Sequence, residues 1–316
     1  MKVKKKIESW LKIHASDRKF SMNNSSEPLY YFITGTGRCG TMLYAKIFNT
    51  SVHSECHHEK FFRHNSMINF YTKRSIHGFL EDIQGLRNHT QQKDKSLRFF
   101  GISSGHLYFA LPLLNKIFGS RARYILAVRE PEGFVRSALA RGFFDPAHPN
   151  YCEQLPFKYH DSLHPKNMSI TPFEKTAWYW RMVNEYTLQA LADISYEQWK
   201  VLPLEKLSPE KLYEISSWLG LEDLTLSQIS SMMEQRINVS PVNDDSLTMT
   251  KHELNPYSIA INTSPLSTEE INILDLYTKD LAASIASECF CSPSNLMPAT
   301  EKLYGAMKKQ LNKIAQ

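Results

Sequence analysis

The chain has 316 residues, of which 42% are hydrophobic and 22% are charged, as in folded globular proteins and not in disordered ones. Its five cysteines include no Cys-x-x-Cys pair, which argues against a disulfide framework or a zinc finger and favours a reducing compartment. The formal net charge of +5 is concentrated in the first 20 residues, so the remainder is formally neutral and nucleic-acid binding is not expected.

Residues 1–28 are predicted to form a basic N-terminal tail outside the folded domain. Val3, Ile7 and Trp10 follow helical spacing among lysines, so the tail is either a basic helix on an anionic membrane surface or a solubilising extension. No continuous apolar run follows Met1, and the chain has no run of about 18 apolar residues that would predict a membrane span. We therefore expect a cytoplasmic protein, with peripheral membrane contact if the tail forms the basic helix.

Four short apolar runs, rich in aromatic and β-branched residues, predict buried parallel strands at 29–34, 99–102, 124–128 and 199–202. Helices are predicted between them, at 41–48, 111–118, 131–139 and from Pro172 to about Ile194. This alternation predicts βαβ units and an α/β fold, a three-layer sandwich with a central parallel sheet of the P-loop nucleotide-binding type.

Helix starts are marked by a hydroxyl residue followed by acidic side chains, at Thr171, Ser208 and Ser267. Three segments lack a clear period and are expected to be irregular and to build a substrate pocket: 60–97, 145–170 and 238–265. The folded domain is expected to span residues 29–290, followed by an amphipathic basic helix within residues 291–316.

The main chemical signal is the run GTGRCGT at residues 35–41, between the first predicted strand and the first predicted helix. Glycines there let successive backbone N–H groups point at one anion, and the helix N-terminus adds unpaired amides and a positive dipole. The run departs from a nucleoside triphosphatase P-loop, because Thr41 stands where that motif has its lysine and the basic residue is Arg38, inside the loop. A tight turn whose glycines serve only packing is the alternative.

This loop resembles that of the sulfotransferases that use 3′-phosphoadenosine 5′-phosphosulfate (PAPS), in which Lys or Arg is followed by a small residue, Gly, and Thr or Ser. The resemblance implies that the loop and the first helical residues hold the 5′-phosphate: Gly37, Arg38, Cys39, Gly40, Thr41 and Met42. The run VREPEGFVRS at 128–137 resembles the family's 3′-phosphate segment, with Arg129 and Ser137 in the phosphate-binding positions. Glu130 replaces the more common Asp, and weaker similarity extends the match over residues 29–225.

The resemblance implies a PAPS-dependent sulfotransferase that moves the sulfuryl group to a hydroxyl by in-line displacement, with no metal required. The acceptor is left open among glycan, lipid, small molecule and peptide, and the oligomeric state is undetermined. The alternatives are an ATP-dependent phosphotransferase and a non-catalytic nucleotide-binding module. The missing loop lysine and the segment at 128–137 argue against the first, and the retention of Arg38 and Glu59 argues against the second.

A dense group of titratable residues follows the first predicted helix, as Cys56-His57-His58-Glu59. We expect a buried Glu59 to take the acceptor's proton, with His57 or His58 as the alternative base, and Arg38 to stabilise the leaving oxygen. A zinc site built from His53, Cys56, His57 and His58 is disfavoured, because the set holds one cysteine only. Two further expectations are that His106 lines the acceptor pocket or has a core or capping role, and that Cys39 tends toward the thiolate.

Overall fold

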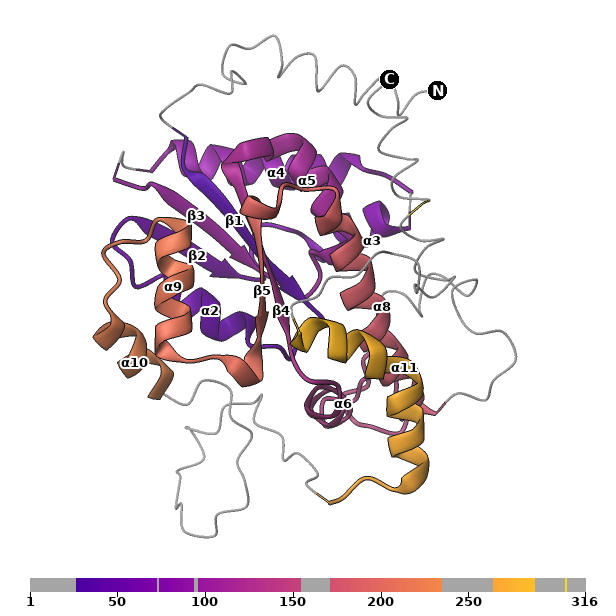
Figure 1. Ribbon diagram of the computed structural model, residues 1–316. Coiled ribbons are helices and arrows are strands. Elements are labelled where there is room, and N and C mark those ends of the chain that lie inside the picture. The colour runs from indigo at the N-terminus through magenta and orange to yellow at the C-terminus, as the bar shows by residue number, and fades with distance from the viewer. Residues whose placement is uncertain are drawn as a thin grey trace, which may run out of the picture.

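The computed structural model describes residues 27–72, 74–93, 96–154, 171–234, 264–287 and 305. The predicted N-terminal tail up to residue 26, all of the predicted C-terminal helix except Gly305, and nearly all of segment 238–265 lie outside these residues. The described part contains a central parallel sheet with helices on both faces (Figure 1). This is the three-layer α/β fold expected from the sequence.

The sheet has five strands in the order β2-β3-β1-β4-β5, all parallel. Their bounds are β1 (Leu29–Gly35), β2 (Ser54–His58), β3 (Phe99–Ser103), β4 (Ala122–Val128) and β5 (Trp199–Pro203). Four of them lie where apolar runs predicted strands, and β2 is a fifth strand that no apolar run marked. Strand β1, which leads into the GTGRCGT loop, lies at the centre of the sheet.

Alternation along β1 divides the core into two layers, because successive side chains of a strand point to opposite faces. Tyr30 and Phe32 belong to one buried apolar cluster, and Tyr31 and Ile33 belong to the other. The first cluster includes residues of α4 (His77–Gln91), α5 (Leu111–Phe118), α6 (Pro131–Leu139) and α8 (Pro172–Ala192), and the second those of α2 (Thr41–Phe48), α9 (Pro209–Leu219) and α10 (Leu226–Glu234). Both faces of the sheet are therefore covered, as its continuous apolar strands require.

The predicted capping signals are present at the helix starts. Thr171 and Ser208 accept hydrogen bonds from backbone N–H groups in the first turns of α8 and α9. Ser267 forms a reciprocal capping box with Glu270 at the start of α11 (Thr268–Ala286). Helix α11 is tied to α8 by Arg181, which pairs with Asp280 as well as with Glu185 of its own helix. None of the described helices is long and apolar enough to cross a membrane.

The expectation that residues 60–97 are irregular is wrong. This segment contains α3 (His64–Tyr71) and α4, which pack against each other and supply part of the larger core cluster. In α4 the buried side chains Phe79, Leu80, Ile83 and Leu86 have helical spacing. The many polar residues between them, and the absence of a side-chain cap at the helix start, concealed this pattern in the sequence.

Candidate active site

The carboxyl ends of the parallel strands meet at one edge of the sheet, which is where open α/β sheets bind ligands. A cavity of about 500 Å³ lies there. Its lining comes from the loop after β1, the end of β2, the turn after β3 and the segments that follow β4 and α6. Residues far apart in the sequence are thus brought to one concave surface.

The loop after β1 bends through left-handed backbone conformations at Gly37, Arg38 and Gly40, with φ of 72°, 54° and 87°. Glycine adopts such angles without strain, which accounts for two of the three positions. Gly40 is the N-cap of α2 and supplies no side-chain cap, so an anion can take the place of a capping group at the first helical amides. A Cβ at Gly105 would lie 2.8 Å from the Gly37 nitrogen, so the turn after β3 packs directly against the loop.

The two predicted phosphate segments converge on the cavity. The Nε of Arg38 donates a hydrogen bond to the Oγ of Ser137 over 3.2 Å. Arg129 donates from Nη1 to the backbone oxygen of Arg38 over 3.4 Å. The backbone oxygen of Arg129 in turn accepts a bond from the indole of Trp180 in α8, at 2.8 Å. Three residues singled out by the sequence therefore form one connected group.

Arg141 is a third cation of the cavity that the sequence analysis missed. Burial, followed by the positive charges of Arg141 and Arg129, lowers the pKa of Arg38 to about 10. Clustered like charges repel one another in a partly buried site, and an anion among them relieves this repulsion. The available sequence signal was the position of Arg141, just beyond the end of the helix that contains Ser137.

The other loop residues divide between cavity and core. Gly37, Gly40, Thr41 and Met42 line the cavity. Thr41 is held on both sides, because its Oγ1 is hydrogen-bonded to the Nε2 of His58 at 3.1 Å and its backbone oxygen accepts from the Ser103 hydroxyl at 2.7 Å.

Cys39 differs from its neighbours in the loop. Its side chain is fully buried in the cluster beneath α2, so only its backbone can face an anion. Burial raises the pKa of its thiol to about 11, and the expectation of a thiolate at Cys39 is therefore wrong.

Glu59, His58 and His106 all line the cavity, and the expectation of a buried Glu59 is wrong because its side chain is exposed. The backbone of Glu59 has a φ of 51°, uncommon for a residue other than glycine, and its N–H donates to the Ser103 oxygen over 3.0 Å. Burial lowers the pKa values of His58 and His106, an effect that the nearby charge of Glu59 opposes in both. The three side chains thus form an acid–base cluster beside the loop.

His57 does not belong to this cluster, although the sequence offered it as an alternative base. Strand alternation turns it to the other face of β2, where its Nε2 lies 2.6 Å from the Oε1 of Glu55. Cys56 is buried in the cluster beneath α2, and its neighbour His58 contacts α2 through Thr41. The disfavoured zinc set of His53, Cys56, His57 and His58 is therefore divided between two faces of the sheet.

Comparison with known proteins gives similarity of fold only. No protein-family model matches the sequence, and no curated protein has a significantly similar one. Three similar solved structures are the sulfotransferase from Alicyclobacillus acidocaldarius, the sulfotransferase domain from the curacin biosynthetic pathway, and that of the Synechococcus PCC 7002 olefin synthase. Their TM-scores are 0.45, 0.41 and 0.42, with identities of 10%, 14% and 14%. The matches cover 84%, 89% and 91% of this chain, and 96%, 98% and 97% of the chains of the three solved structures. The function of the cavity must therefore be argued from its own side chains.

Proposed function

We propose that the protein is a sulfotransferase that transfers the sulfuryl group of PAPS to a hydroxyl acceptor in this cavity. The observation that supports it is the convergence of Arg38, Arg129 and Ser137, from the loop after β1, the end of β4 and helix α6. A guanidinium fork beside a hydroxyl suits a terminal phosphate, and loop amides at a helix N-terminus suit a second one. A nucleotide with phosphates at both its 3′ and 5′ positions presents these two groups together.

The two phosphate subsites are assigned as follows. The 5′-phosphosulfate lies over the loop amides and the Thr41 hydroxyl. His58 is hydrogen-bonded to this hydroxyl, and Ser103 donates to the backbone oxygen of Thr41. The 3′-phosphate lies at Arg129 and Ser137. Arg38 starts in the loop and reaches Ser137, so its guanidinium serves both subsites. Arg141 adds positive charge to the same cavity.

In the transfer step, the acceptor oxygen forms a bond to sulfur as the bond between sulfur and the bridging oxygen breaks. The bonding electrons pass to the 5′-phosphate, where Arg38 and the loop amides stabilise the developing negative charge. Glu59 removes the proton of the acceptor hydroxyl, so the products are a sulfate ester and 3′-phosphoadenosine 5′-phosphate (PAP). The exposed position of Glu59 on the cavity lining leaves its carboxylate accessible to an incoming acceptor.

PAP is expected to bind in EDTA with the same affinity as in the presence of magnesium, because arginines and amides neutralise its phosphates. Isothermal titration calorimetry with PAP and with ATP, each in EDTA and in magnesium, measures this directly. Binding of ATP that requires magnesium, with no binding of PAP, would instead indicate an ATP-dependent phosphotransferase.

Arg129→Ala is expected to weaken PAP binding by about ten- to a hundredfold, the equivalent of one lost charge-assisted hydrogen bond of about 1.5 to 3 kcal/mol. Binding of adenosine 5′-phosphosulfate, which lacks the 3′-phosphate, should change little. Arg123→Ala, at the opposite end of β4, is the matched control and should leave both affinities unchanged. Equal losses for the two ligands in Arg129→Ala would place this side chain away from the 3′-phosphate.

A further inference from the structure

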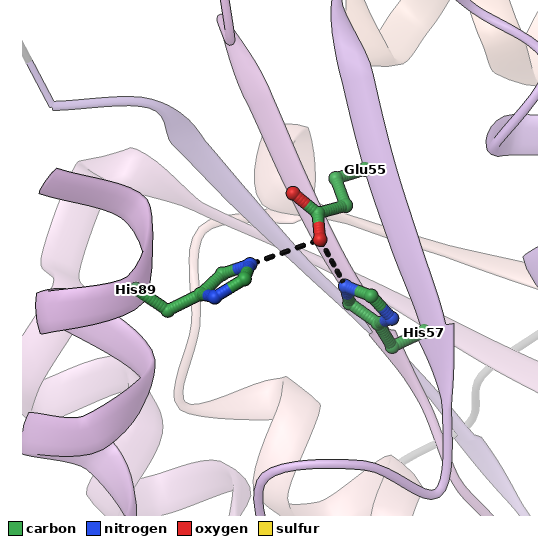
Figure 2. Close-up of side chains that lie close together, drawn as sticks. All are labelled: Glu55, His57 and His89. Carbon is green, nitrogen blue, oxygen red and sulfur yellow. Dashed lines mark hydrogen bonds and ion pairs between the residues drawn. The ribbon is translucent and has the colours of Figure 1, made fainter. Parts of the chain in front are cut away.

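A second polar cluster lies on the face of β2 opposite to His58 and is not used by the proposed reaction. Glu55 and His57 project from β2, and His89 projects toward them from α4 (Figure 2). The Oε1 of Glu55 lies 2.6 Å from the Nε2 of His57 and 2.9 Å from the Nε2 of His89. These three atoms all lie within 4.8 Å of one another, and all three side chains are partly buried. Two imidazoles and one carboxylate thus direct their donor atoms at one point.

Two aromatic rings hold both imidazoles in place. The ring centroid of Phe61 lies 5.2 Å from that of His57 and 5.0 Å from that of His89. The ring of Phe100 lies 5.6 Å and 5.7 Å from the same two imidazoles. Because each imidazole contacts both phenylalanines, the two donor nitrogens are fixed by packing and not only by their shared carboxylate. An apolar shell of this kind is typical of preorganised metal sites.

The donor set selects the class of ion. Two imidazole nitrogens with one carboxylate oxygen suit zinc and similar divalent transition metals, whereas magnesium and calcium prefer oxygen ligands. Tetrahedral zinc, with bonds of about 2.0 to 2.2 Å, places its ligand atoms roughly 3.3 Å apart. The Glu55 oxygen therefore has to withdraw from both imidazoles by about half an ångström, which a side-chain rotation provides. Lys93 pairs with the other carboxylate oxygen at 3.1 Å and leaves the Oε1 facing both imidazoles.

We propose that Glu55, His57 and His89 bind one divalent transition-metal ion of the zinc class, with a water molecule completing its coordination. The ion joins helix α4 to edge strand β2. It is separate from the nucleotide subsites, since His57 and His58 point to opposite faces of β2. Nucleotide binding is accordingly independent of this ion.

The test is a titration of zinc chloride into the full-length, EDTA-treated and desalted protein, followed by calorimetry and by thermal unfolding. We expect one zinc ion per chain to bind at Glu55, His57 and His89. The melting temperature should rise when zinc is added and fall again when EDTA removes it. His89→Ala should weaken this binding by more than about tenfold, since even the loss of an outer-shell partner of a metal costs ten- to a hundredfold. His77→Ala is the matched control, because His77 is an exposed histidine of the same helix.

Glu55→Gln and a cobalt titration keep the test decisive if His89→Ala fails to fold. Glutamine retains the shape of the side chain but removes the anionic ligand, so zinc affinity should fall while the circular dichroism spectrum stays unchanged. Cobalt bound by the native protein should show the visible absorption of a tetrahedral site, and magnesium should give no heat. The proposal is overturned if the folded native protein binds no zinc, or if Glu55→Gln binds it as tightly as the native protein does.

Discussion

Glu59→Gln is expected to lower turnover by between about a hundredfold and ten-thousandfold, the range that a general base contributes. Affinity for PAP should remain nearly unchanged, because the proposed phosphate contacts, which are the loop, Arg129 and Ser137, are all retained. In this variant, turnover should therefore fall while PAP affinity stays the same. Calorimetry with PAP measures the affinity. Single-turnover sulfuryl transfer from PAPS to a hydroxyl acceptor that the native protein sulfates measures the rate.

His58→Ala is the informative comparison, because His58 also lines the cavity and is hydrogen-bonded to Thr41. If His58 only positions Thr41, its loss should weaken PAP binding together with turnover. Should Glu59→Gln keep more than about half of the native rate while His58→Ala abolishes turnover at unchanged affinity, the base is an imidazole and not this carboxylate.

Arg38→Ala should weaken PAP binding and also lower turnover. The loss of one donor to a developing oxyanion costs about a hundred- to a thousandfold in turnover. PAP affinity should fall as well, because the guanidinium contacts Ser137 in the 3′-phosphate subsite. Relief of the repulsion from Arg129 and Arg141 will offset part of this second loss.

Two further variants separate the charge of Arg38 from its shape. Arg38→Lys retains a cation but loses the planar fork, and should recover PAP affinity more than turnover. Lys46→Ala removes an exposed cation of the helix that follows the loop and should change neither quantity. A native rate in Arg38→Ala would show that the leaving oxygen is stabilised by another group.

The sequence predicted the layers of the fold because its strands are continuous apolar runs with helices between them. It also located the loop after β1 that lines the cavity, because glycines stand there between a strand and a helix. The sequence does not mark residues 54–58 as a strand by an apolar run, so it does not separate His57 from His58. Once β2 is known, strand alternation places the two histidines on opposite faces of the sheet.

Other features depend on contacts across the sequence that no local pattern records. The burial of Cys39 follows from α2 packing on the sheet, and the exposure of Glu59 follows from the left-handed turn at the end of β2. Arg141 reaches the cavity because α6 ends just before it. The approach of His89 to Glu55 requires α4, a helix that was missed when residues 60–97 were expected to be irregular.

The place of β1 in the sheet constrains the order in which a nascent chain can fold. β1 is the first strand to leave the ribosome, but it pairs with β3 and β4, which begin only at Phe99 and Ala122. Its aromatic side chains therefore stay exposed through most of the synthesis of the N-terminal half and are available to chaperones or to aggregation. A chain arrested before Ser137 lacks part of the proposed nucleotide site, so under that proposal added PAP assists the maturation only of longer nascent chains.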